Sequence, residues 1–249
     1  MTPTDLAGLA ALILVAAGLY SMVGHAGASG YLAAMAIYGL APAVMKPSAL
    51  VLNLLVATIA TVQFARAGHF AWDRFWPFAL TSIPFAFLGG ALAIPDVAYR
   101  RVVGVVLVYA AWRLFFFSSA RAPGAERKPV PRLLALPIGA GIGFLSGLVG
   151  VGGGIFLSPL LLLAGWADAR TTAGVSAAFI LVNSAAGLLG HVTSVRLLPP
   201  GMAGLGAAAV AGGLLGSTLG SRRLAPPMLR RLLAVVLVVA AVKLIRGGG

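Results

Sequence analysis

The stretch that decides the fold is Gly143-Phe-Leu-Ser146-Gly-Leu-Val-Gly150-Val-Gly152-Gly153-Gly154-Ile-Phe-Leu-Ser158-Pro159. Glycines at this density interrupt a helix, and the apolar run that follows, 154–165, is too short to cross a bilayer core of roughly 30 Å. The pattern predicts a half-helix or one arm of a re-entrant hairpin. The start of such a helix exposes backbone N–H groups, which predicts an anion site without a charged side chain. Close helix packing through small residues is the alternative.

A related stretch lies near the N-terminus and reads Ser21-Met-Val-Gly24-His25-Ala-Gly27-Ala-Ser29-Gly30-Tyr31. It also precedes a short apolar run, 28–40, which predicts a second half-helix. His25 stands where the other stretch has Val151. His25 and Ser29 are four residues apart and share a face if this stretch is helical. An imidazole in a helix break indicates an anion donor or a proton carrier, and the alternative is a core histidine whose bonds are satisfied.

The composition places the whole chain in a membrane. Of 249 residues, 60% are hydrophobic and 9% are charged, whereas a soluble domain has about 45–50% and about 25%. Open strands cannot satisfy their backbone in lipid, and these runs do not alternate as barrel strands do, so we expect an all-α integral membrane protein of about eight to ten segments. The first run lacks a cleavage signal, and we expect it to be retained. The apolar runs are 6–23, 28–40, 48–65, 76–94, 102–118, 133–150, 154–165, 172–192, 201–219 and 231–245.

The chain contains signs of an internal duplication. Seven of ten residues are identical between 105–114 and 235–244, and the same offset of 130 aligns Asn53 with Asn183. The two glycine stretches align at an offset of 126. We therefore predict an N-terminal membrane repeat (1–118), a linker (119–132) and a C-terminal membrane repeat (133–249). Because each repeat has about five segments, an odd number, the repeats should have inverted topology.

The charges indicate sidedness and exclude several functions. The 18 Lys and Arg residues outnumber five acids and gather in the loops, which is a topological pattern rather than a nucleic-acid surface. It predicts that the linker 119–132 and the loop 220–231 are cytoplasmic and that both termini are periplasmic. No apolar run has a central carboxylate, which argues against a carboxylate proton relay, a cation channel or a metal-ion carrier. With no Cys and three scattered His, no metal site is expected.

Two further kinds of residue are candidates for the site. Asn53 and Asn183 each lie inside an apolar run, where an amide needs partners, so they indicate either a shared central site or hydrogen bonds between helices. His191 is a second candidate for proton coupling beside His25. Lys46 lies at the mouth of a segment and is expected to be a snorkelling or topological residue. The predicted substrate-binding residues are Gly24, His25, Gly27, Ser29, Gly30, Asn53, Ser146, Gly150, Gly152, Gly153, Gly154 and Asn183.

The two glycine stretches, above all Ser146-Gly147 to Gly154 with Pro159 following, resemble the sulfite exporter TauE/SafE family, whose members are also called toluene sulfonate uptake permeases. The resemblance covers nearly the whole chain. It implies transport of sulfur-containing anions across the bacterial inner membrane, without a cofactor and by a non-enzyme. The N-terminal copy departs from the family pattern at His25, Ala26, Ala28 and Ser29, so the substrate can differ from that of better-known members.

These observations favour a secondary transporter of sulfite or an organosulfonate, with the anion at the membrane midplane between the two helix breaks. The lipid bilayer and the small anion are the expected partners, and a homodimer is left open. A passive anion channel is the first alternative. The second is a rhomboid-like intramembrane serine protease with Ser29 as nucleophile and His191 as base, a pair that requires hydrogen-bond reach.

Overall fold

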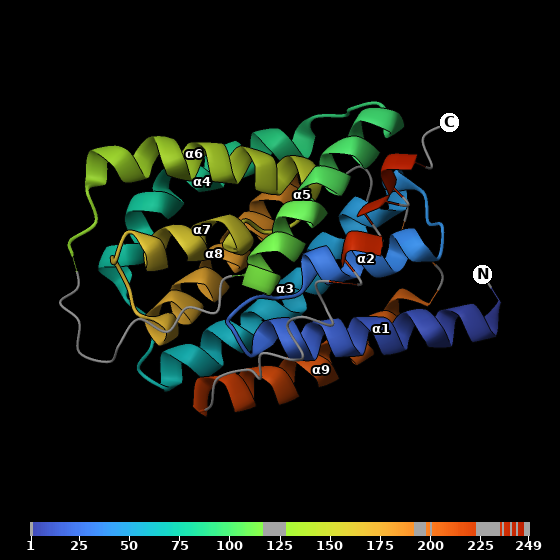
Figure 1. Ribbon diagram of the computed structural model, residues 1–249, viewed down its shortest axis with the longest axis horizontal. Coiled ribbons are helices and arrows are strands. Elements are labelled where there is room, and N and C mark those ends of the chain that lie inside the picture. Colours follow the sequence, from blue (N-terminus) through green and yellow to red (C-terminus); the bar gives the residue numbers. More distant parts are fainter. Residues whose placement is uncertain are drawn as a thin grey trace.

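The computed structural model describes residues 2–116, 128–191, 198–199 and 201–222, together with helical residues at 235, 237–239, 241–242 and 244–246. All regular structure in these residues is helical (Figure 1), which confirms the all-α prediction. Most of the linker 119–132 and of the loop 220–231, and part of the run 231–245, lie outside the described residues. The helices are α1 (Pro3–Ser21), α2 (Ala28–Ile37), α3 (Pro42–Arg66), α4 (Trp72–Ala91), α5 (Asp96–Phe116), α6 (Arg132–Val149), α7 (Gly154–Leu163), α8 (Ala169–Gly190) and α9 (Met202–Arg222).

Helix length separates two kinds of element. Five helices, α1, α3, α6, α8 and α9, are long and apolar enough to cross a membrane. By contrast, α2 and α7 have 10 residues each, which is about 15 Å of helix and half a bilayer core. The prediction of two short helices after the glycine stretches is therefore confirmed.

Each short helix turns back toward the start of the helix before it. Gly8, near the start of α1, packs against the ring of Tyr38, the residue after α2. In the second pair, the amide of Lys128, just before α6, donates to the carbonyl of Gly165, just after α7, at 3.1 Å. The pairs α1–α2 and α6–α7 are therefore hairpins, and the glycine-rich breaks at 22–27 and 150–153 form their bends.

Glycines let two pairs of long helices touch backbone to backbone. On α6, a Cβ at Gly139 or Gly143 would lie within 2.3 Å of a carbonyl oxygen of α4. On α9, a Cβ at Gly212 or Gly216 would lie within 2.2 Å of a carbonyl oxygen of α1. In both pairs the glycines are four residues apart, which is the small-residue spacing of tightly packed membrane helices.

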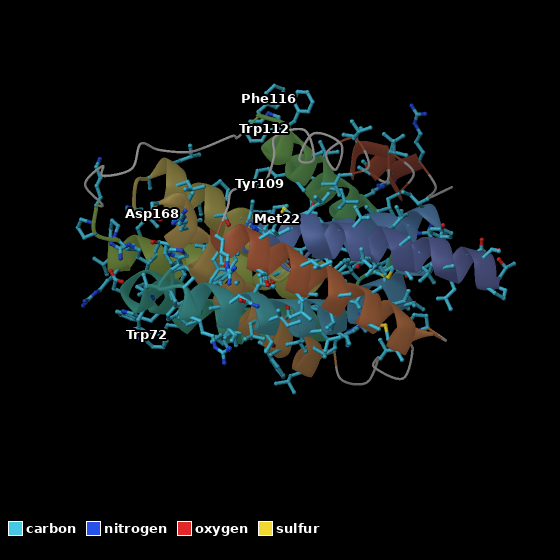
Figure 2. All side chains as sticks on the ribbon, turned by 90° about the horizontal axis from the view of Figure 1, so that it is seen from below. Met22, Trp72, Tyr109, Trp112, Phe116 and Asp168 are labelled. Carbon is cyan, nitrogen blue, oxygen red and sulfur yellow. The ribbon has the colours of Figure 1, made fainter. Side chains whose placement is uncertain are left out.

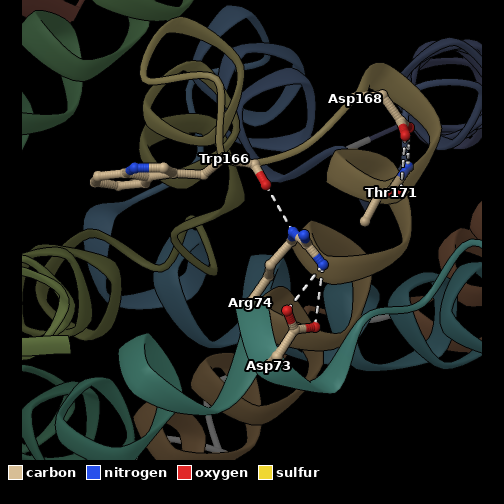
Figure 3. Close-up of polar contacts among 5 residues, drawn as sticks. All are labelled: Asp73, Arg74, Trp166, Asp168 and Thr171. Carbon is tan, nitrogen blue, oxygen red and sulfur yellow. Dashed lines mark hydrogen bonds and ion pairs between the residues drawn. The ribbon is translucent and has the colours of Figure 1, made fainter. Parts of the chain in front are cut away.

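The four described acids lie at helix N-termini, in agreement with the prediction that no apolar run has a central carboxylate. Asp5, Asp73 and Asp96 lie in the first turns of their helices, where a negative charge interacts favourably with the helix dipole. Asp168 is the N-cap of α8 and accepts from the amide of Thr171 at 2.8 Å (Figure 3). Nearby, Arg74 pairs with Asp73 and donates to the carbonyl of Trp166 at 2.6 Å, which ties α4 to the turn between α7 and α8. None of these carboxylates takes part in the helix breaks.

The outer surface is apolar. Trp72, Trp112 and Phe116 project outward (Figure 2) and are 64%, 49% and 66% exposed. Exposed apolar surface of this extent is typical of a protein that faces lipid. A set of polar side chains, among them His25, Asn53 and Asn183, is by contrast buried inside the helix assembly.

Candidate functional site

The two short helices begin in the same way. The N-cap of α2 is Gly27, with φ of +108°, and the N-cap of α7 is Gly153, with φ of +81°. A side chain is strained in this left-handed region, so glycine is the residue that allows the helix to restart there. No hydrogen bond among the described residues uses the amides of Ala28, Ser29, Gly154 or Ile155. These positions are buried, so each helix start holds unused donors away from water.

His25 connects the two breaks. Its Nδ1 lies 3.0 Å from the carbonyl oxygen of Val23, and its Nε2 lies 3.1 Å from the carbonyl oxygen of Gly154 on α7. Ser158 Oγ is 3.0 Å from the same Nε2. A carbonyl only accepts, and a neutral imidazole has one N–H, so only the protonated ring can donate to both carbonyls. The ring is 4% exposed.

Hydroxyl groups extend the contacts of His25 along both hairpins. Ser158 Oγ lies 2.7 Å from Ser176 Oγ on α8. On the other side, Ser29 Oγ donates to the hydroxyl of Tyr20 at 2.6 Å, and the hydroxyl of Tyr31 donates to the carbonyl of Ala26. The predicted residues His25, Gly27, Ser29 and Gly154 are thus brought together.

These residues enclose a small cavity at the start of α2. Its volume is about 10 Å³, which is room for about one water molecule. A cavity of this size has no room for a larger ligand in this conformation. The cavity is lined by Tyr20, His25, Ala26, Gly27, Ala28, Ser29, Val151, Ile155 and Ile180.

The two asparagines lie in a different polar cluster. Asn53 Nδ2 donates to Ser184 Oγ at 3.3 Å, across the contact between α3 and α8. Asn183 Oδ1 accepts from Ser82 Oγ of α4 at 2.5 Å. Both asparagines are fully buried, and Asn53 Oδ1 and Asn183 Nδ2 have no partner among the described residues. Gly152 borders this cluster, since a Cβ there would lie 3.0 Å from Asn53 Nδ2 and from Ser184 Oγ.

The other predicted site residues have packing roles in the structure. A Cβ at Gly24 would meet the carbonyl oxygen of Ala173 on α8 at 2.2 Å, and Gly30 packs on Ala16 and Tyr20. Gly150 packs against the backbone of Lys46 and donates its amide to the carbonyl of Ser146 at 2.8 Å. The hydroxyl of Ser146 is buried and has no partner among the described residues.

Lys46 differs from its expected snorkelling role, because it is only 5% exposed. Its ammonium donates to the carbonyl of Gly90 at 2.9 Å and to that of Gly89 at 3.4 Å, the last carbonyls of α4. A cation at a helix C-terminus complements the helix dipole. The sequence shows Lys46 at the mouth of a segment, but its carbonyl partners come from another helix.

His191 lies just beyond the end of α8, beside Lys46 and Gly90 rather than beside His25. Burial, together with the positive charge of Lys46, holds the pKa of His191 below its usual range, against a hydrogen bond with the Gly90 backbone that raises it. The neutral ring is therefore favoured at this position.

Comparison with known proteins agrees with the helical membrane architecture. The family described as sulfite exporter TauE/SafE matches residues 9–244. A probable membrane transporter protein of Sinorhizobium fredii is 41% identical over 246 residues, which cover 97% of this chain and 99% of that protein. A probable membrane transporter protein of Methanocaldococcus jannaschii is 28% identical over 142 residues, covering 55% of this chain and 51% of that protein. No solved structure matches.

Proposed function

Because the chain belongs to the sulfite exporter TauE/SafE family of membrane transporters, we propose that it carries sulfite or an organosulfonate across the bacterial inner membrane by alternating access. The observation that carries this proposal is the meeting of two buried helix N-termini at His25. Unused amides and an imidazole supply donors to an anion, and no described carboxylate competes with it. The small anion itself is what the family implies as substrate.

The anion would bind at the start of α2, between His25 and the second break. The amides of Ala28 and Ser29 would donate to its oxygens, as would His25 Nε2 once the ring turns from the Gly154 carbonyl. Because the cavity of about 10 Å³ is too small for such an anion, the cycle requires the breaks to part, admit the anion and close again. Alternating access requires such a change between two states.

We also propose that the two halves, 1–118 and 133–249, are inverted repeats. Reciprocal contacts support this: Gly24 of the first break packs on the α8 backbone, and Gly150 of the second break packs on the α3 backbone. The pairing of α9 with α1 corresponds to that of α4 with α6. In this proposal the linker 119–132 and the loop 220–231 face the cytoplasm, and both termini face the periplasm.

Proton coupling is assigned to His25 within this proposal. Its two ring nitrogens each lie within hydrogen-bond distance of a carbonyl oxygen, so a ring that takes up a proton could donate to both, and a proton and an anion would bind together with little net charge. His191 is the weaker candidate, because its neighbour Lys46 already carries a positive charge.

The protease alternative is wrong, because the family consists of transporters rather than enzymes. The hydroxyl of Ser29 donates to Tyr20, and His191 lies beside Lys46 and Gly90. The passive channel remains the competing proposal, and a flux experiment separates it from a carrier.

The first experiment is uptake of radiolabelled sulfite by proteoliposomes, with and without a proton gradient. Unlabelled sulfite inside the vesicles should accelerate uptake of label, because a carrier exchanges substrate across the membrane. An organosulfonate and sulfate serve as competitors and rank the substrates. Saturable flux without acceleration by internal sulfite would favour the channel. Absence of sulfite flux in any gradient would reject sulfite as the substrate.

A further inference from the structure

One face of α8 alternates between polar and apolar side chains across the buried part of the molecule. Ser176, Ile180 and Ser184 follow one another at intervals of four residues, so they lie in a row along the helix. Their exposed fractions are 0%, 2% and 0%. Ile180 is therefore one helical turn from a buried hydroxyl on either side.

The two hydroxyls belong to separate polar clusters. Ser176 contacts Ser158, which contacts His25, and we name these three residues the histidine station. Ser184 accepts from Asn53, and with the neighbouring Asn183 these form the asparagine station. Among the described residues, Ser158 and Ser176 share no hydrogen bond with Asn53, Asn183 or Ser184. Both stations offer the amide, imidazole and hydroxyl donors that an oxyanion accepts.

Ile180 fills the space that the glycines of the second break leave open. A Cβ at Gly152 would lie 2.6 Å from Ile180 Cγ2, and a Cβ at Gly154 would lie 2.5 Å from Ile180 Cδ1. Gly152 also borders Asn53 and Ser184, whereas Gly154 borders His25. Ile180 in addition lines the cavity at the start of α2. Its side chain is thus in contact with the surroundings of both stations.

We propose that Ile180 is the gate residue between two anion stations, and that the anion passes from one to the other only when the second break moves off Ile180. The inference rests on the proposed function and adds to it a second station and the barrier between them. An ion next to an isoleucine loses hydration without gaining donors, so the seated side chain is a barrier. The absence of side chains at Gly152 and Gly154 is what lets the break close on Ile180.

The test compares Ile180→Ala with Ile13→Ala in proteoliposomes. Ile13 is fully buried in an apolar cluster on α1, so it controls for the volume lost. A potassium diffusion potential set with valinomycin drives nitrate, and its decay reports anion leak independently of sulfite recognition. We expect Ile180→Ala to leak at least about tenfold faster than the wild type, equivalent to about 1.4 kcal/mol of barrier, and Ile180→Val to restore most of the seal.

The result that would overturn the gate is a folded Ile180→Ala protein that holds the potential as well as the wild type, or an Ile13→Ala protein that leaks equally. Folding is checked by thermal melting in detergent. A wild type that moves no sulfite, combined with a leaking Ile180→Ala, would reject the proposed substrate and keep the gate. The failure of one proposal is therefore distinguishable from the failure of the other.

A second measurement avoids a cavity mutant. The chain contains no cysteine, so Ser176→Cys and Ser184→Cys can each be labelled with a membrane-impermeant thiol reagent. During turnover, the thiol of Ser176→Cys should react with reagent added on the side of the membrane where α8 begins. The thiol of Ser184→Cys should react with reagent added on the opposite side. Labelling of both cysteines from one face, or of neither, would contradict two stations separated by Ile180.

Discussion

The two helix breaks share left-handed glycines, Gly24 with Gly150 and Gly27 with Gly153, but hold different side chains. Each has a left-handed glycine N-cap followed by a helix of 10 residues. The first break, 22–27, is followed by hydroxyls and contains His25, which reaches across to α7. The second, 150–153, contains only Gly and Val, and side chains from other helices, Asn53 and Ile180, fill its surroundings. The first break thus contributes polar side chains. The second contributes backbone amides and leaves room that side chains of other helices fill. In the proposed repeat arrangement, the glycine N-cap is kept in both breaks while their side chains differ, which allows one break to bind and the other to close.

The largest expected effect concerns how tightly each break packs. A Cβ at Gly24 would lie 2.2 Å from the α8 carbonyl of Ala173, whereas a Cβ at Gly150 would lie 3.2 Å from the α3 carbonyl of Lys46. We expect Gly24→Ala to destabilise the protein by about 3–5 kcal/mol or to prevent folding. Gly150→Ala should cost about 1–2 kcal/mol. Thermal melting in detergent measures both.

Gly39→Ala is the matched control for Gly24→Ala. Gly39 has φ of +73°, close to the +74° of Gly24, but a Cβ there meets nothing within 4 Å. It should therefore show only the cost of the left-handed backbone, about 1 kcal/mol. If Gly24→Ala and Gly39→Ala melt alike, the first break is not held by its contact with α8.

The chemical difference between the breaks is tested by exchanging their contents. His25→Val gives the first break the valine that the second has at position 151. We expect flux to fall at least about tenfold, since one hydrogen bond to a charged group contributes about 1.5–3 kcal/mol. The free energy of unfolding should change only slightly, because the Gly154 carbonyl keeps its hydrogen bond from Ser158 at 2.8 Å. His69→Val, outside both breaks, is the control, and unchanged flux in His25→Val would remove the histidine from binding.

How far the sequence predicts this arrangement depends on the reach of each contact. The short helices follow from the lengths of the apolar runs, and the donors of the breaks follow from the glycines. Lys46 could not be placed, because its carbonyl partners are 43 and 44 residues away. Ile180 carries no signal at all in the sequence, since an isoleucine in an apolar helix is ordinary core. The asparagines indicate either a shared central site or hydrogen bonds between helices, and the partner of Asn183, Ser82, is determined only by the packing of α4 on α8.

The dependence of transport on pH extends the comparison to protonation. In the proposed cycle a protonated His25 donates to both carbonyls and attracts the anion, so transport should decrease as rising pH removes this proton. The ring of Tyr20 on α1 lies 6.4 Å from the imidazole, and the hydroxyl of Tyr31 on α2 donates to the carbonyl of Ala26, next to His25. The pH profile is measured with an organosulfonate, because the charge of this substrate does not change over the pH range in which an imidazole titrates. A profile that is equally steep in His25→Val would assign the titration to another group.

A further asymmetry lies at the base of the second break. Lys46 corresponds, at the offset of 126, to Thr172, whose hydroxyl is buried without a partner among the described residues. Lys46→Thr should destabilise the protein by about 1–2 kcal/mol, because the last carbonyls of α4 lose a charged donor. Lys46→Arg keeps the charge and serves as the control. A melting temperature unchanged by Lys46→Thr would show that the α4 carbonyls find other donors.

The smallest expected effect separates packing from binding within the first break. In Tyr20→Phe, Ser29 loses the hydroxyl that accepts from it at 2.6 Å, and the cavity keeps its ring. If Ser29 is free to turn toward the anion, the lost bond costs about 1 kcal/mol of stability at most, and substrate affinity stays the same or improves by about twofold. The half-saturation concentration for sulfite measures this, with Tyr31→Phe as the comparison, because Tyr31 donates to the break backbone itself. A large loss of affinity in Tyr20→Phe alone would instead mean that the phenol contacts the anion, and the binding surface of the first break would then extend from α2 onto α1.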